Sequence, residues 1–453
     1  MTVWGTATLA STGHCMSQDP RVTLATSPMT PAQVVVVAIT VAITALDGFD
    51  VLSIAFASPG IAREWGIGGG KLGVVLGAEL AGMMVGSITL GGLCDRVGRR
   101  YTMLGCLAVM ALGMAMAATA RGVYDLSAWR VFTGLGIGGI LAASNAVASE
   151  FANARRRDLS VSLMAIGYPL GAIFGGKVAA VLLKGGNWRA VFEFGALATA
   201  IFLPIVYFWV PESVAWLCQK QPARALEAVN RSLKRLGRAA VDALPAPIRL
   251  AQRPPLAEIF RPELAATTIL VTLTYFMHIT TFYFIIKWVP KIVVDMGFAM
   301  STAANVLVWT NVGGATGGAV LGLLTHRLGL KPLTVAMLLG SAVMVTVFGH
   351  GQATLAQLSL ICATAGFCTN GAVVGIYAVL ARAFPTELRA TGTGFAIGAG
   401  RGGAALAPAV AGFLFQAGFG LQAVAVLMSV GSLLSAICMS MVRLKTRDSI
   451  ADA

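Results

Sequence analysis

The sequence predicts an all-α membrane protein of twelve transmembrane helices in two six-helix halves, with both termini in the cytoplasm. Three observations predict this fold: the composition, the recurring apolar stretches, and basic residues that gather in the loops on one side of the membrane. Hydrophobic residues make up 57% of the 453 positions and charged residues 11%, whereas soluble domains have about 45–50% and 25%. A soluble fold would leave much of that apolar surface in water, so we expect most of the chain to lie in a bilayer.

Apolar stretches near the roughly 20 residues that a spanning helix needs recur along the chain. We place them at 34–58, 72–93, 101–120, 125–148, 158–184, 190–211, 264–290, 302–325, 332–350, 354–381, 387–414 and 418–442. The longer polar stretch after the sixth divides them into two sets.

This spacing predicts five segments. They are a disordered cytoplasmic tail at 1–33, an N-terminal bundle at 34–211, a cytoplasmic linker at 212–263, a C-terminal bundle at 264–442 and a second tail at 443–453. Helical periodicity around Ala223–Leu236 predicts an amphipathic helix on the membrane surface within the linker.

Basic residues orient the spans. Arg96, Arg99 and Arg100 follow the second span, and Arg155–Arg157 follow the fourth. The linker adds further Lys and Arg on the same side, which the positive-inside rule identifies as cytoplasmic. The same rule accounts for the net charge of +14 without nucleic acid. The seven cysteines are scattered, and no nucleophile–base pattern occurs, so we expect no metal, no cofactor and no enzyme activity.

The two halves share an internal repeat. Gly91–Arg100 (GGLCDRVGRR) aligns with Gly322–Lys331 (GLLTHRLGLK), and each segment follows the second helix of its half. Phe151 and Arg156 align with Phe384 and Arg389. Repeated halves of this kind build a central site between two rocking bundles.

Three motifs resemble those of the major facilitator superfamily. Gly91–Arg100 resembles its signature loop, Arg130-Val-Phe-Thr-Gly134 its fourth-helix arginine motif, and Pro211-Glu-Ser213 the motif that closes its sixth helix. The resemblance covers the whole chain after the first tail and implies the twelve-helix fold of that superfamily.

Three further motifs resemble the aromatic acid:proton symporters within that superfamily. They are Asp47-Gly-Phe-Asp50 in the first helix, Trp288-Val-Pro290 in the seventh and Gly400-Arg401-Gly402 in the eleventh. The resemblance implies a monomer of the inner membrane that takes up a small aromatic carboxylate with protons, by alternating access, and supplies aromatic degradation. A carrier of non-aromatic acids, an exporter and a non-transporting sensor with the same fold remain open.

Asp47, Asp50 and Arg130 are our candidates for proton coupling. The two aspartates lie three residues apart and share a helix face. Two neighbouring carboxylates in a low dielectric do not both ionise easily, which suits a proton carrier. Arg130 is expected at the depth of Asp50, where a labile ion pair would link protonation to gating. A purely structural ion pair is the alternative. For Glu79, a substrate path and a lipid-headgroup contact remain open.

Arg401 is our candidate for the substrate carboxylate, because it matches Asp47 in depth and its fork binds a carboxylate through two hydrogen bonds. A permanent ion pair with either aspartate is the alternative. Tyr275, His278 and Tyr283 in the seventh helix are candidates for contacting an aromatic ring and its hydroxyl. Asn311 and Asn370 are further cavity candidates.

The signature loop supplies the candidate gate. Asp95 is expected to pair with Arg96, Arg99 or Arg100 and to latch the halves in one state. In the second copy His326 stands in the place of Asp95 and precedes Arg327. That exchange predicts a weaker second latch, or one that responds to pH.

Overall fold

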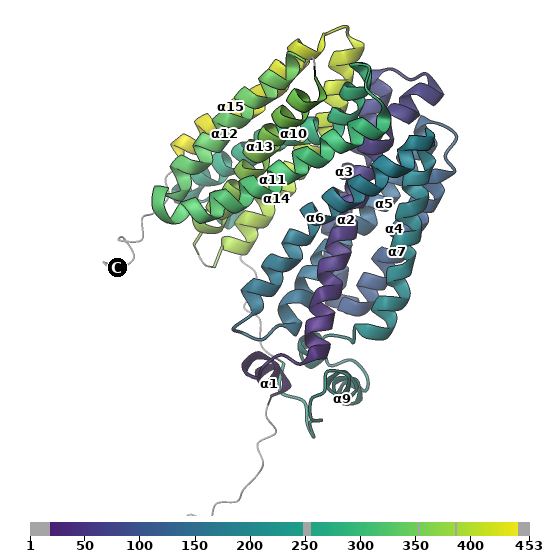
Figure 1. The fold of residues 1–453 in the computed structure, drawn as a ribbon. Coiled ribbons are helices and arrows are strands. Elements are labelled where there is room, and N and C mark those ends of the chain that lie inside the picture. Colours follow the sequence, from purple (N-terminus) through teal and green to yellow (C-terminus); the bar gives the residue numbers. More distant parts are fainter. Residues whose placement is uncertain (1–18, 248–254, 352–353, 386, 443–453) are drawn as a thin grey trace, which may run out of the picture.

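The computed structural model describes residues 19–247, 255–351, 354–385 and 387–442, and these form two adjacent helical bundles (Figure 1). Within these ranges, twelve helices are long and apolar enough to cross a membrane. The first bundle holds α2 (Pro31–Trp65), α3 (Gly69–Val97), α4 (Arg99–Ala118), α5 (Val123–Phe151), α6 (Arg157–Leu182) and α7 (Arg189–Trp209). The second holds α10 (Pro262–Asp295), α11 (Met300–Leu328), α12 (Leu330–Gly349), α13 (Leu355–Ala383), α14 (Arg389–Gln416) and α15 (Leu421–Met441). The predicted twelve-helix fold is confirmed.

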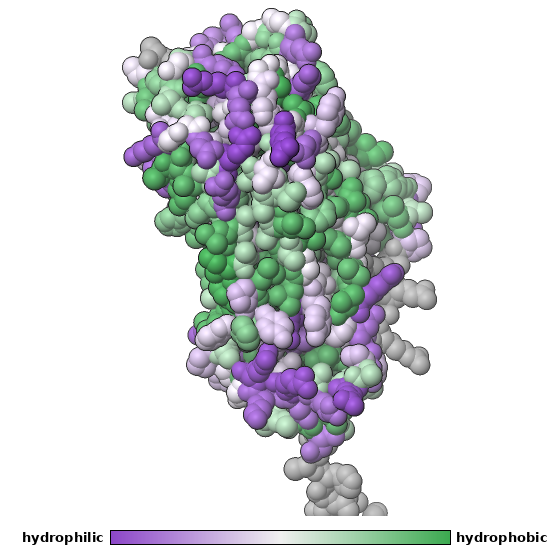
Figure 2. Space-filling view, turned by 90° about the vertical axis from the view of Figure 1, so that its right-hand side faces the viewer, coloured by the Kyte–Doolittle hydropathy of each residue, from purple (hydrophilic) through white to green (hydrophobic). Residues whose placement is uncertain are grey.

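The surface agrees with a membrane location. Figure 2 shows hydrophobic residues across the middle of the molecule, with hydrophilic residues gathered at its two ends. A bilayer covers such a band and leaves both ends in water. We call the side where α2 begins and α15 ends the terminal side, and the opposite side the far side.

Part of the predicted disordered tail is helical. Helix α1 (Pro20–Thr26) is capped by Asp19, whose carboxylate accepts a 2.9 Å hydrogen bond from the backbone N–H of Arg21. The backbone N–H of Ala154 donates to the carbonyl of Ala25 at 2.8 Å. These bonds dock α1 on the first bundle, so the expectation for 1–33 is wrong over the helical part. Residues 1–18 lie outside the described ones.

The linker contains α8 (Val214–Lys220), α9 (Ala225–Arg235) and the 3₁₀ helix η2 (Leu256–Phe260). Helix α9 lies where periodicity predicted one. Its apolar residues Val229 and Leu233 are buried, and the helix packs on α8. The apolar face is therefore covered by protein.

The internal repeat reappears as a repeated helix contact. In the first bundle, a Cβ on Gly134 of α5 would overlap the carbonyl oxygen of Glu79 on α3. In the second, a Cβ on Gly366 of α13 would overlap the carbonyl of Thr310 on α11. Glycine thus lets the second and fourth helices of each half approach to backbone contact.

The two halves are packed together on the far side. There a Cβ on Gly73 of α3 would overlap the carbonyl of Pro408 on α14, and a Cβ on Gly412 would overlap that of Gly69. Within the second half, the buried indole of Trp288 donates to the same carbonyl of Pro408 at 3.1 Å and so holds α14 against α10. The backbones of α3 and α14 are therefore in direct contact at these positions on the far side.

Candidate functional site

Five charged side chains are buried where the halves meet. Asp47 and Asp50 of α2, Glu79 of α3, Arg130 of α5 and Lys287 of α10 are each at most 2% exposed. Charged groups at membrane depth are costly unless they are paired or functional. The way these five pair therefore determines what the site can do.

Glu79 binds both buried cations. Its carboxylate forms an ion pair with the Arg130 guanidinium, and its Oε2 lies 3.3 Å from Nζ of Lys287. Lys287 also donates to the carbonyl of Val51. Since Lys287 belongs to the second half and its partners to the first, this pair bridges the halves. The lipid-headgroup interpretation of Glu79 is wrong, because the side chain is fully buried.

The expected ion pair between Arg130 and the Asp50 carboxylate is absent from the described residues. Nη2 of Arg130 instead donates to the backbone carbonyl of Asp50 at 3.0 Å. Gly134 lies one turn along α5 from Arg130 and allows α3 to approach closely. Glu79 of α3 therefore forms the ion pair with the Arg130 guanidinium. No sequence motif marks Glu79, and nothing in the sequence pairs it with Lys287 of the other half.

The two aspartates have weak partners. The Thr199 hydroxyl donates to Oδ2 of Asp50 at 3.4 Å. Within the described part of the chain, Oδ1 of Asp47 and Oδ1 of Asp50 accept no hydrogen bond. Asp47 lies within electrostatic range of Glu79 and Arg401. Two buried carboxylates with free oxygens are able to take up protons.

Arg401 lies at the head of a cavity between the halves. The cavity, of about 720 Å³, is lined by Met84, Ser87, Ile88, Ala381, Arg389, Thr393, Gly394, Ile397, Gly398 and Arg401. Arg401 also lines a smaller one of about 400 Å³ against α5. Helices α3, α5 and α13 end on the terminal side, and their lining residues lie in the second half of each helix. Helix α14 begins on the terminal side, and its lining residues lie in its first half. The cavity therefore faces the terminal side.

The Arg401 guanidinium is half-buried, and Nη1 donates to the carbonyl of Met83 at 3.2 Å. Among the residues that the structure describes, no carboxylate forms an ion pair with it. The alternative, a permanent pair with Asp47 or Asp50, is thus not present in this conformation. Arg401 retains donors for a carboxylate in the cavity.

The aromatic candidates of α10 separate into two groups. Nδ1 of His278 lies 2.9 Å from the Ser432 hydroxyl and Nε2 lies 2.9 Å from the Thr369 carbonyl, so both ring nitrogens are engaged within the second bundle. Tyr275 packs its ring on Gly400, next to Arg401. Tyr283 lies within electrostatic range of Arg401. The tyrosines lie near the cavity head, whereas His278 joins helices.

Both predicted asparagines bind backbone of α11. Nδ2 of Asn311 donates to the carbonyl of Leu307 at 2.8 Å, and Nδ2 of Asn370 donates to that of Gly314 at 2.7 Å. The second bond ties α13 to α11. Neither residue lines the two cavities.

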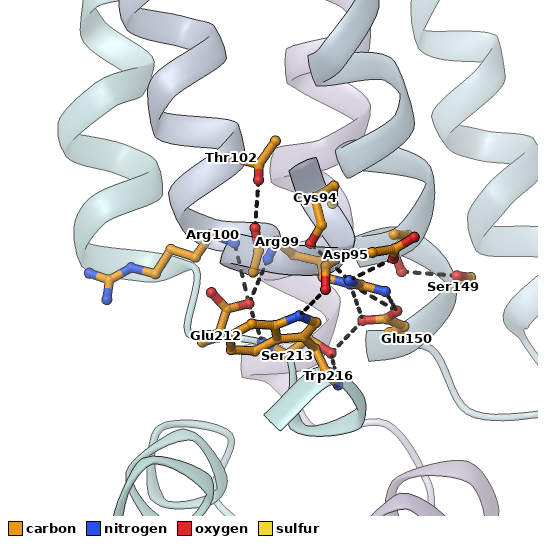
Figure 3. A network of polar contacts seen from close by, with 12 residues as sticks. Cys94, Asp95, Arg99, Arg100, Thr102, Ser149, Glu150, Glu212, Ser213 and Trp216 are labelled. Carbon is orange, nitrogen blue, oxygen red and sulfur yellow. Dashed lines mark hydrogen bonds and ion pairs between the residues drawn. The ribbon is translucent and has the colours of Figure 1, made fainter. Parts of the chain in front are cut away.

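The signature loop forms a polar network on the terminal side of the first bundle (Figure 3). Arg99 lies 3.1 Å from the carboxylate of Asp95 and 2.9 Å from that of Glu150 at the end of α5. The Trp216 indole of α8 donates to the carbonyl of Asp95 at 3.0 Å. All these partners belong to the first half and its linker, so in this conformation the network does not latch the two halves together.

Glu212 connects α4 to the chain after α7. Its Oε1 accepts hydrogen bonds from the backbone N–H groups of Arg99, Arg100 and Ser213 at 2.8, 3.3 and 2.9 Å. Burial raises the pKa of Glu212, although these bonds lower it in part. The sequence placed Glu212 in a motif, but its role as a cap for α4 needed the structure.

The other gating candidates make fewer contacts. Nη2 of Arg100 donates to the Tyr207 carbonyl at 2.5 Å. Arg96 and Arg327 are exposed. The side chain of His326 lies outside the described ones, so the altered second latch stays a prediction.

The twelve apolar helices define a polytopic membrane protein, and the proteins that it resembles are transporters rather than enzymes. The model of the Major Facilitator Superfamily matches residues 40–318 and 271–451, and the chain belongs to this superfamily. It is 29% identical to a gallate transporter of Pseudomonas putida, over 87% of this chain and 88% of the relative. It is 29% identical to a 4-hydroxybenzoate transporter of Pseudomonas aeruginosa, over 90% and 91%. A solved D-xylose–proton symporter shares the fold, with a TM-score of 0.70 and 19% identity over 91% and 98% of the two chains.

Proposed function

We propose that the protein takes up a small aromatic carboxylate of the hydroxybenzoate type, with protons, across the inner membrane by alternating access. The observation that carries the proposal is the position of Arg401, which presents an ion-pair-free guanidinium to the cavity between the halves. Similarity to carriers of gallate and 4-hydroxybenzoate supports the choice of acid. We also propose the five segments predicted from the sequence, and that the protein acts as a monomer.

Arg401 binds the substrate carboxylate in this proposal. A guanidinium forms two parallel hydrogen bonds to a carboxylate, and it stays charged at any physiological pH. Tyr275 and Tyr283 lie near the same point and offer aromatic faces. Because His278, Asn311 and Asn370 are used in helix contacts, we assign them no direct substrate contact in this conformation.

Asp47 and Asp50 carry the protons. Their free oxygens are buried, and Asp47 is electrostatically coupled to Arg401. A substrate anion at Arg401 adds negative charge near Asp47 and therefore favours its protonated form. Proton binding and substrate binding thus strengthen one another, which is the condition for symport.

The terminal side is the cytoplasmic side in this proposal, by the distribution of basic residues. The conformation seen here then has its cavity open to the cytoplasm and its far side closed. Substrate leaves from this state, and the carrier returns by opening the far side.

Uptake of labelled 4-hydroxybenzoate by cells that express the full chain tests the proposal. We expect uptake that an uncoupler abolishes. Arg401→Gln should reduce it about 10- to 100-fold, because a charge-assisted hydrogen-bonded pair is lost. Arg401→Lys should lose most of the uptake, because an ammonium group cannot form the two parallel hydrogen bonds that a guanidinium forms with a carboxylate. Arg231→Gln, at an exposed arginine of α9 in the linker, is the control.

The rival functions give different results in the same assay. No uptake above vector cells, with the protein found in the membrane, removes this substrate. Competition by non-aromatic acids alone identifies a different acid carrier. Uptake that rises with uncoupler identifies an exporter, and saturable binding without flux identifies a sensor.

A further inference from the structure

Four of the seven tyrosines of the chain converge on the site. Tyr168 comes from α6, Tyr275 and Tyr283 from α10, and Tyr377 from α13. Tyr168 lies within electrostatic range of Tyr283, Tyr377 and Asp47. Tyr377 lies within the same range of Arg401. Three phenols of the second half therefore lie within electrostatic range of the Arg401 guanidinium, and the phenol of Tyr168 in the first half lies within the same range of two of them.

Tyr275 and Tyr377 form a pair. Their hydroxyl oxygens are 2.8 Å apart, and their ring centroids are 5.4 Å apart. The Tyr275 ring lies against Gly400, where a Cβ would overlap it. Only 4% of Tyr275 is exposed. Packing on α14 thus fixes the Tyr275 ring, and the hydrogen bond fixes Tyr377.

Tyr377 is the accessible member of the pair. It is 41% exposed, although it lies among the phenols and Arg401 rather than on the outer surface. Ala381, which follows it by one helical turn and shares its helix face, lines the cavity beneath Arg401. The exposed part of Tyr377 therefore faces the space between the halves.

The pair has spare hydrogen-bonding capacity. Two phenols supply two O–H donors, and their mutual hydrogen bond uses one of them. One O–H donor and several lone pairs remain for a third group. A phenolic hydroxyl, which both donates and accepts, is the group that this arrangement fits.

We propose that Tyr377 is the residue that distinguishes ring-hydroxylated acids from unsubstituted ones, with Tyr275 positioning it. The inference rests on the proposed function, since it assumes that Arg401 holds the carboxylate. Binding of an unsubstituted ring would bury the free phenol O–H without a partner. A site built to bond a substrate hydroxyl rejects the analogue that lacks it for this reason.

The experiment compares two acids in Tyr377→Phe, Tyr275→Phe and the wild-type chain. Each unlabelled acid, 4-hydroxybenzoate or benzoate, competes for uptake of labelled 4-hydroxybenzoate. Tyr124→Phe is the matched control, because Tyr124 is 88% exposed and distant from the cavity. The amount of each variant in the membrane is measured by a C-terminal tag.

We expect the wild type to prefer 4-hydroxybenzoate over benzoate by about tenfold or more. Tyr377→Phe should reduce this ratio to within about threefold, because the hydroxylated acid loses a hydrogen bond and benzoate no longer leaves a phenol O–H unpaired. Tyr275→Phe should weaken the hydroxylated acid less, because Tyr377 keeps its own hydroxyl.

Two outcomes overturn the inference, and they are distinguishable. If labelled 4-hydroxybenzoate is taken up and Tyr377→Phe keeps the wild-type ratio of competition, the specificity role alone fails. If the wild type carries neither acid, the proposed function fails together with the role of Tyr377.

Discussion

Arg130 and Lys287 both bind Glu79, and among the described residues neither forms an ion pair with Asp47 or Asp50. Removing one partner of a buried ion pair leaves an uncompensated charge, which is far costlier than the net contribution of the pair. The aspartates escape this constraint because they have no such partner. Each can therefore gain or lose a proton without leaving a cation stranded.

Replacing Asp47 by Asn tests this role. Asn resembles the protonated carboxyl in size but cannot release a proton. We expect Asp47→Asn to reduce proton-driven net uptake at least about tenfold and to preserve exchange of labelled for unlabelled substrate, which needs no proton release. Counterflow in proteoliposomes measures both. Asp125→Asn, at an exposed position where the carboxylate accepts from Arg121, should behave like wild type.

Loss of both net uptake and exchange by Asp47→Asn, with the protein correctly inserted, would assign Asp47 a structural role. Retention of uncoupler-sensitive net uptake would exclude it from proton coupling.

At the scale of helices, glycine contacts make each half a rigid unit. Gly134 on α5 meets the Glu79 carbonyl on α3, and Gly366 meets that of Thr310 in the other half. Interdigitated backbones do not slide without a clash. The motion of transport is therefore expected between the bundles rather than within them.

Gly134→Ala tests the first of these contacts. The added Cβ overlaps the Glu79 carbonyl, so the helices must separate at a cost of about 1–3 kcal/mol. Gly105 is the matched control, because it also lies within a helix and has open space around it. Both changes raise helix propensity equally. We expect the melting temperature of the purified protein to fall for Gly134→Ala and to stay constant or rise for Gly105→Ala.

Equal melting temperatures for the two variants would contradict the packing argument. A fall in both would point to the helix backbone rather than to the contact between α3 and α5.

The helices were predicted from the sequence, but the ion pair of Glu79 with Lys287 between the two halves was not. Apolar length and basic loops report on membrane crossing directly, so the twelve spans were found. Arg401 was found because a charge at mid-membrane depth has few purposes. Glu79 and Lys287 were not paired, since spacing along one helix does not tell which face meets another bundle. Tyr377 carried no motif, and its exposure became evident only in three dimensions.

At the scale of the whole molecule, Lys287 is an ionic contact between the halves. It lies on the packed far side, where its partners Glu79 and Val51 belong to the other bundle. Opening that side requires Lys287 to leave both partners. The bridge therefore stabilises the state whose cavity faces the terminal side.

Lys287→Gln should shift the protein toward the state open on the far side. Val308 of α11 reports this shift, because it is 2% exposed and packs against Gly176 of α6 at a second seam between the halves. In a chain whose native cysteines are replaced, we expect an impermeant thiol reagent to label Val308→Cys about tenfold faster from the far side. Lys177→Gln is the control, since the exposed Lys177 crosses the same seam to neutral Asn305 at 3.1 Å. Unchanged labelling in Lys287→Gln would show that the bridge does not set this equilibrium.

Voltage acts on the molecule as a whole. An anion that enters against a negative interior is opposed by about 2.3 kcal/mol per charge per 100 mV. One accompanying proton cancels this opposition, and two reverse it. Asp47 and Asp50 together provide room for either ratio.

The one-sided cavity has a pharmacological consequence. An aromatic acid that carries a bulky substituent could place its carboxylate on Arg401 and still be too large for the far side to open around it. Such a molecule, added on the terminal side, would block the cavity and hold the carrier in this conformation. From the far side it would meet the packed seam between α3 and α14. Inhibition by that compound would therefore depend on the face of the membrane to which it is added.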